Sequence, residues 1–103
     1  FDEWDMFSDI PNNIYVGQNY PNPFNPITNI KYELYKEEFV KVTVHDILGN
    51  TVNNLLKTRQ TSGDKSLQWN ATDNHGQKVP AGLYFYSIEA GDLKQTKKMI
   101  LLK

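Results

Sequence analysis

The chain has 103 residues, with 11 basic and 12 acidic side chains, a formal net charge of -1 and no cysteine. These totals exclude disulfides, thiol nucleophiles and cysteine-based zinc sites, and the balanced charge gives no electrostatic reason to expect nucleic acid as a partner. The length is that of one domain, and a hydrophobic content of 39% is enough for one core.

The first 13 residues differ from the rest of the chain. Their apolar side chains recur every three positions, as on one face of a short helix: Phe1, Trp4, Phe7 and Ile10. Pro11 ends the pattern, and so short a helix is marginal in water. Because the chain opens on Phe rather than Met, we expect residues 1–13 to be a linker from a missing N-terminal region and residues 14–103 to be the domain.

The next feature is "NYPNPFNP", residues 19–26, in which prolines stand among asparagines. Proline fixes its own φ and disfavours helix in the residue before it. We therefore expect a stiff, irregular lead-in to the first strand, with Tyr20 and Phe24 packed against one end of the domain. A cis bond between Tyr20 and Pro21 is the minority form, since about 5–6% of X–Pro bonds in folded proteins are cis.

After this segment, apolar and polar residues alternate with a period of two, which is typical of strands with one buried face. We expect strands over residues 30–34, 40–45, 52–56, 66–69, 83–90 and 93–102. The alternation is broken at Leu55 and Leu56, which indicates a bulge. No helical pattern of 10–15 residues separates the strands, so a parallel α/β sheet is not expected.

Turn signals separate these runs. Gly49 in "DILGN" suits the left-handed conformation of a hairpin loop. "VPAG", residues 79–82, suits a type I turn with Pro80 second and Gly82 fourth, and Gly91-Asp92 is a two-residue hairpin signal. Six or seven short strands with such turns favour an all-β sandwich or barrel.

The sequence offers no set of catalytic or metal-binding residues. His45 falls on the polar side of a valine-rich strand and His75 in a turn, and neither has a second histidine at metal-ligand spacing. Asp46, Asp64 and Asp73 lie in or beside turns, where aspartate is common for backbone reasons, although calcium held by such carboxylates stays open. The longest apolar run has four residues, far short of the ~18–20 that a membrane span needs. We expect neither enzyme activity nor a cofactor.

Aromatic residues leave one alternative open. Trp69, Tyr84, Phe85 and Tyr86 could form a platform that stacks on sugars, but in a small sandwich such residues are more often core. The alternative, an accessory carbohydrate- or cell-wall-binding module, requires these aromatics to be exposed in one patch.

Four stretches together resemble one family: "QNYPNPFNPITNIKYEL" (18–34), "VTVHDILGNTV" (42–52), "SGDKSLQWNATDNHGQKVPAGLYFYSIEAG" (62–91) and "KKMILLK" (97–103). The family is the C-terminal sorting domain (type A) carried by cargo of the type IX secretion system of Bacteroidetes-like bacteria. The third stretch also resembles the immunoglobulin-like domain of flagellar hook-capping proteins.

The resemblance implies an immunoglobulin-like antiparallel sandwich of seven strands that serves as an address label on a larger secreted protein. It implies that the outer-membrane type IX machinery recognises the domain after the cargo, in the same polypeptide, has reached the periplasm. A sortase of the cysteine-protease class then removes the label, and the cargo is anchored at the cell surface or released.

The resemblance also assigns roles to residues. The suspected recognition residues are Lys97, Lys98, Met99, Ile100, Leu101, Leu102 and Lys103. The structural motif residues are Pro21, Pro23, Phe24, Pro26, Gly49, Trp69, Gly82 and Tyr84. If the last strand lies at a sheet edge, a receptor could also pair with its backbone by strand addition.

Overall fold

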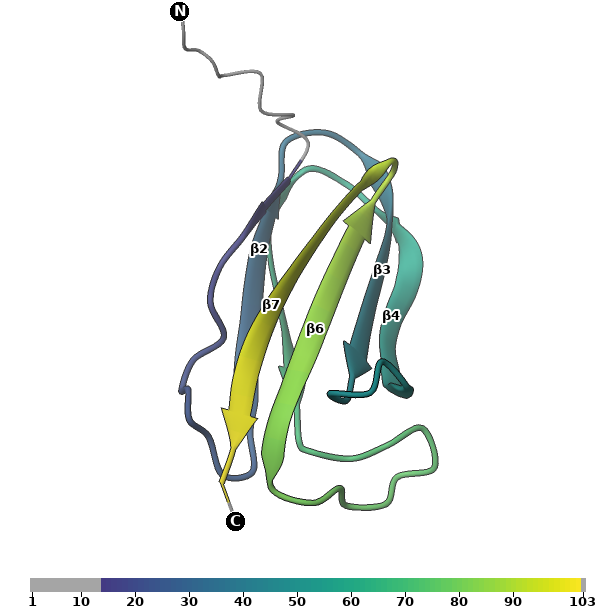
Figure 1. Cartoon of the computed structure of the whole chain (residues 1–103). Helices are drawn as coiled ribbons and strands as arrows, with labels where there is room; N and C mark the ends of the chain where they lie inside the picture. The colour runs from purple at the N-terminus through teal and green to yellow at the C-terminus, as the bar shows by residue number, and fades with distance from the viewer. Residues whose placement is uncertain (1–13, 103) are drawn as a thin grey trace, which may run out of the picture.

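The computed structural model describes residues 14–102. Seven strands follow one another: β1 (Ile14–Val16), β2 (Thr28–Leu34), β3 (Glu38–His45), β4 (Thr51–Gln60), β5 (Gly63–Trp69), β6 (Gly82–Ala90) and β7 (Leu93–Leu101). They form a three-stranded sheet in the order β1-β2-β5 and a four-stranded sheet in the order β4-β3-β6-β7, and all paired strands are antiparallel (Figure 1). The predicted all-β antiparallel sandwich of about seven strands is confirmed.

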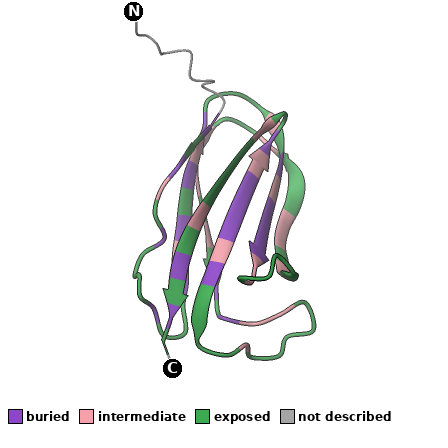
Figure 2. Ribbon diagram, viewed as in Figure 1, coloured by how far each residue is buried: buried purple, intermediate pink, exposed green. Residues whose placement is uncertain are grey.

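Alternation along each strand places one side in the core between the sheets. On β3, Val40, Val42 and Val44 are fully buried, as the period of two predicts. On β7, buried and exposed positions alternate toward its C-terminal end (Figure 2). The three-residue strand β1 is too short to show a period of two, and the sequence pattern missed it.

The bulge predicted in the fourth strand is present. Val42 pairs with Leu56, but Thr43 pairs with Asn54, so Leu55 is an extra residue on β4. A second register shift falls between Val44 and His45. Both irregularities kink β4, which is an edge strand of its sheet.

The turn glycines behave largely as predicted. Gly49 has φ +88° in the β3–β4 loop, and Gly91 has φ +60° in the two-residue loop between β6 and β7. Gly82 is instead the first residue of β6, with φ +150°, paired with Leu101.

Residues 1–13, predicted to be a linker, and Lys103 lie outside the described residues, so the division into linker and domain stays a prediction. From residue 14 to residue 102, no helix is long and apolar enough to cross a membrane.

Candidate docking site

The last strand, β7, turns its residues alternately toward and away from the core. Met99 and Leu101 face inward and are 0% and 4% exposed. Ile100, between them, is 42% exposed, and Leu102 after the strand is 50% exposed. Lys98 is exposed as well. Among the described residues of the predicted recognition segment, Lys98, Ile100 and Leu102 are therefore open to a partner, while Met99 and Leu101 hold the strand in the core.

The proline-asparagine segment lies along the outer edge of β7. We call residues 17–26 the clasp. The Gln18 side-chain Nε2 donates to the carbonyl oxygen of Lys98 at 2.9 Å, and the Ile100 N–H donates to Asn22 Oδ1 at 2.9 Å. The Phe24 N–H donates to the Ile100 oxygen at 3.0 Å. The Phe24 carbonyl oxygen accepts from the Leu102 N–H at 2.8 Å.

These bonds correct one expectation. The last strand is an edge strand, as predicted, but the clasp already occupies the outward backbone groups from Lys98 to Leu102. Backbone groups that point outward from an edge strand recur at every second residue, so Lys94 and Thr96 carry the next outward groups on this edge. Strand addition to the C-terminal half of β7 would require the clasp to leave.

A buried polar network anchors the clasp at Asn19, which is 2% exposed. Its Nδ2 donates to Thr28 Oγ1 at 2.9 Å and to the Pro21 oxygen at 3.2 Å, and Thr28 Oγ1 donates to the Pro21 oxygen at 2.8 Å. The Asn19 N–H donates to the Tyr86 hydroxyl at 2.8 Å, which donates to the Gly17 oxygen at 2.7 Å. Sequence reasoning missed Asn19, because an asparagine among prolines first indicates a turn.

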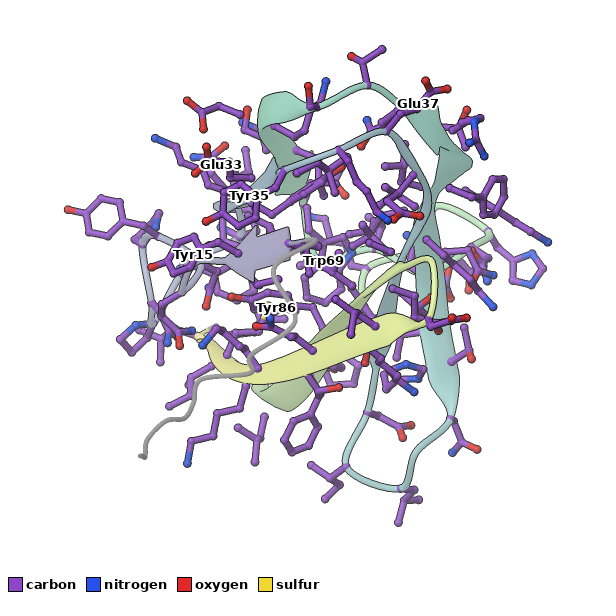
Figure 3. The ribbon with its side chains drawn as sticks, turned by 90° about the horizontal axis from the view of Figure 1, so that it is seen from above. Tyr15, Glu33, Tyr35, Glu37, Trp69 and Tyr86 are labelled. Atoms are coloured by element: carbon purple, nitrogen blue, oxygen red, sulfur yellow. The ribbon has the colours of Figure 1, made fainter. Side chains whose placement is uncertain are left out.

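Tyr86 links this network to the four-stranded sheet. It is fully buried, and Figure 3 shows it between the two sheets together with Trp69. Burial raises the pKa of its hydroxyl to about 12, although the bond from the Asn19 backbone acts in the opposite direction. The neutral hydroxyl, which both donates and accepts, is therefore the form that holds the clasp at neutral pH.

Three of the predicted structural motif residues meet at the end of the sandwich where β7 finishes. The ring centroids of Phe24 and Trp69 are 5.8 Å apart, and those of Trp69 and Tyr84 are 5.5 Å apart in an edge-on arrangement. The Trp69 indole donates to the Thr72 oxygen at 2.9 Å, and the Tyr84 hydroxyl donates to the Pro80 oxygen at 2.6 Å. Phe24 thus fixes the clasp to both sheets.

Two expectations for the clasp were wrong. Tyr20 is 79% exposed rather than tucked in, because it follows the inward-facing Asn19 in an extended segment. The peptide bonds before Pro21, Pro23 and Pro26 are all cis.

The four aromatic residues of the possible sugar-stacking platform were also expected as core residues, and three of the four are in the core. Trp69, Tyr84 and Tyr86 are 1%, 6% and 0% exposed, so the binding-module alternative is not supported. Phe85 differs, because alternation along β6 places it on the outer face, where it is half-buried.

The turn carboxylates organise their own loops. Asp46 Oδ1 accepts the N–H groups of Leu48 and Asn50, each at 2.9 Å, and the backbone bond from Asn50 is the largest cause of its lowered pKa. Asp73 accepts from His75 and Gln77 in the same way, and the bond from Gln77 contributes most to its lowered pKa. Within the part of the chain that the structure describes, no three His, Cys, Asp or Glu side chains gather as a metal site would require.

A groove of about 560 Å³ lies beside the end of β7, lined by residues of the clasp and of the β5–β6 connection. Among its lining residues, Lys78 is the single titratable side chain. The groove therefore lacks the converging acid, base and nucleophile of a hydrolytic site.

Comparison with protein-family models identifies the family of this chain. The family model described as "Secretion system C-terminal sorting domain" matches residues 18–102. A search of curated proteins finds no match.

Solved structures share the fold at low sequence identity. Dimeric latent PorU from Porphyromonas gingivalis has 21% identity and a TM-score of 0.70, and the match covers 94% of this chain and 10% of PorU. PorZ from the same organism has 21% identity and a TM-score of 0.57, covering 87% of this chain and 11% of PorZ. FlgD from P. aeruginosa has 19% identity and a TM-score of 0.57, covering 90% of this chain and 74% of FlgD. The chain thus spans about a tenth of the length of PorU or PorZ.

Proposed function

This chain belongs to the family of secretion system C-terminal sorting domains, and from that premise we propose that it is a non-catalytic label for type IX export. In this proposal the label directs a cargo protein in the same polypeptide across the outer membrane, and the cargo reaches the cell surface or the medium. Its partners are the outer-membrane type IX machinery and a sortase that removes the label, with residues 1–13 as the linker to the cargo.

The observation that carries the proposal is the extent of the family match. Residues 18–102 include the clasp from Gln18 onward, the last strand and Leu102 after it, and hydrogen bonds join the clasp to that strand. PorZ, which shares the fold, is described as an essential bacterial surface component of the type-IX secretion system. The recognition segment Lys97–Lys103 is proposed here as the part of the label that the machinery needs.

A secretion assay tests the proposal. Residues 11–103 are fused behind a fluorescent protein that carries an inner-membrane signal peptide, in a bacterium with a working type IX system. A second fusion ends at Thr96. Because Met99 and Leu101 are core residues, this truncation also destabilises the domain. A third fusion therefore carries Ile88→Ala, which removes core volume from β6 and leaves the last strand intact.

We expect the full fusion to reach the surface or medium, the truncated one to stay in the periplasm, and Ile88→Ala to be exported whenever it is folded. Protease resistance of the periplasmic fraction reports folding. A full fusion that folds yet remains in the periplasm would refute the proposal.

A further inference from the structure

The outer face of the four-stranded sheet carries ordered rows of side chains. The register across β4, β3, β6 and β7 places these outward residues side by side. One row is Lys57, Lys41, Glu89 and Lys94. The next is Asn54, Thr43, Ser87 and Thr96, of which Thr43 and Ser87 are themselves buried. The third is His45, Phe85 and Lys98. In the last, Leu83 lies opposite Ile100.

Within the last two rows, Leu83, Phe85 and Ile100 form an apolar area near the end of β7. Leu83 is 37% and Ile100 is 42% exposed, and they are direct cross-strand partners. Phe85 lies two residues further along β6 on the same face, opposite Lys98. Single exposed apolar residues are normal on a protein surface, but neighbouring ones across two strands are typical of interaction sites.

The same face is cationic. Its rows contain four lysines, at positions 41, 57, 94 and 98, against the one carboxylate of Glu89. Arg59, also on β4, has its guanidinium Nε 2.8 Å from the Glu37 carboxylate, so its charge is already partnered. Two copies stacked by this face would bring lysines against lysines, which disfavours self-association.

We propose that this face is the docking surface of the label, and that its partner is a protein that presents an apolar area beside acidic side chains. The proposal rests on the proposed function and adds which face the export machinery reads. Protein interfaces combine apolar and polar areas, and here Leu83, Phe85 and Ile100 lie at one end of the face with the lysines beside them. A sheet face of this kind fits a protein surface better than a bilayer, which amphipathic proteins enter with a projecting apolar stripe.

The proposed docking surface gives a role to both the outward-facing and the inward-facing residues of the recognition segment. Lys98 and Ile100 face the partner, while Met99 and Leu101 hold the strand in register beneath it. It also brings in Leu83 and Phe85, which the sequence motif at the chain's end does not contain.

The test uses the reporter fusion described above, which carries residues 11–103. One variant is Leu83→Glu with Ile100→Glu, and a second is Lys94→Glu with Lys98→Glu. The milder pair Leu83→Gln with Ile100→Gln serves if the first variant does not fold. Matched controls on the other sheet are Tyr15→Glu, at a side chain that is 59% exposed, and Lys31→Glu.

We expect both double variants to fold, with melting curves like that of the unchanged chain, and to lower the exported fraction about tenfold or more, while the controls leave it unchanged. If the folded double variants are exported like the controls while the truncation at Thr96 stays in the periplasm, the label works but this face is not read. Export of the truncated fusion would instead count against the proposed function.

A lipid partner is tested separately by flotation of the purified chain with vesicles of lipopolysaccharide and phosphatidylethanolamine. We expect no flotation. If the unchanged chain floats and Lys94→Glu with Lys98→Glu does not, the face binds lipid phosphates, and the protein partner is overturned.

Discussion

Replacing Asn19 by alanine tests whether the buried network holds the clasp against β7. The change removes the bonds from Nδ2 to Thr28 Oγ1 and to the Pro21 oxygen, together with the partly buried bond that Oδ1 accepts from Gln18 Nε2. It leaves the backbone bond to Tyr86 in place. Each buried bond contributes about 1 kcal/mol, and the lost side-chain volume adds about 1 kcal/mol. We expect the free energy of unfolding to fall by about 2–3 kcal/mol, a large part of the stability of so small a domain.

Asn22→Ala is the matched control within the clasp. Its Oδ1 accepts the Ile100 N–H at 2.9 Å at an exposed position, where water can replace it. We expect a cost below about 1 kcal/mol. Urea denaturation followed by circular dichroism gives both values, and an unchanged m-value shows that the midpoint reports stability. A cost for Asn19→Ala below about 0.5 kcal/mol, or equal costs for the two variants, would contradict the anchoring role of the network.

Three further outcomes follow from the same structure. Leu101→Ala should cost about 2–5 kcal/mol and Leu102→Ala less than about 1 kcal/mol in urea melts, because one side chain is core and the other is half exposed; equal costs would contradict the inward and outward assignment. Gly49→Ala should cost about 1 kcal/mol and Gly49→Asn less, since φ is +88° and nothing lies within 4 Å of an added Cβ; thermal melts showing no loss for alanine would refute this. The raised pKa of Tyr86 contributes stability that is complete below pH 10 and is lost as the pH rises to about 12, by roughly 2–3 kcal/mol. Tyr86→Phe should flatten that part of the pH profile, and an unchanged slope in urea melts from pH 8 to 12 would count against this cause.

The strands and their buried faces were predictable because they depend on local alternation. Val40, Val42 and Val44 show it directly, and even the bulge at Leu55 could be predicted from a break in the pattern. The loop at Gly49 was predictable for a similar reason, since the need for a positive φ is a property of one residue.

The packing of Phe24 against the end of the domain was predicted, but the pairing of the clasp with β7 was not, because its partners are remote in the sequence. Phe24 bridges to Leu101, and Gln18 bonds to the Lys98 oxygen, 80 residues away. The residues between them give no local sign of this pairing. The rows of residues on the outer face of the four-stranded sheet could not be predicted for a related reason. Only the register of β6 against β7 places Leu83 opposite Ile100.

The direction of the chain through the sandwich has a consequence for modularity. The described chain enters at Ile14 at one end, and β7 finishes at the other, beside the clasp (Figure 1). A strand of nine residues spans about 30 Å at 3.3 Å per residue. Ile14, where the described chain begins, therefore lies at the end of the sandwich opposite to the end where β7 finishes and where docking is proposed. In the proposed label, exchanging one passenger for another would therefore leave the proposed docking face unchanged.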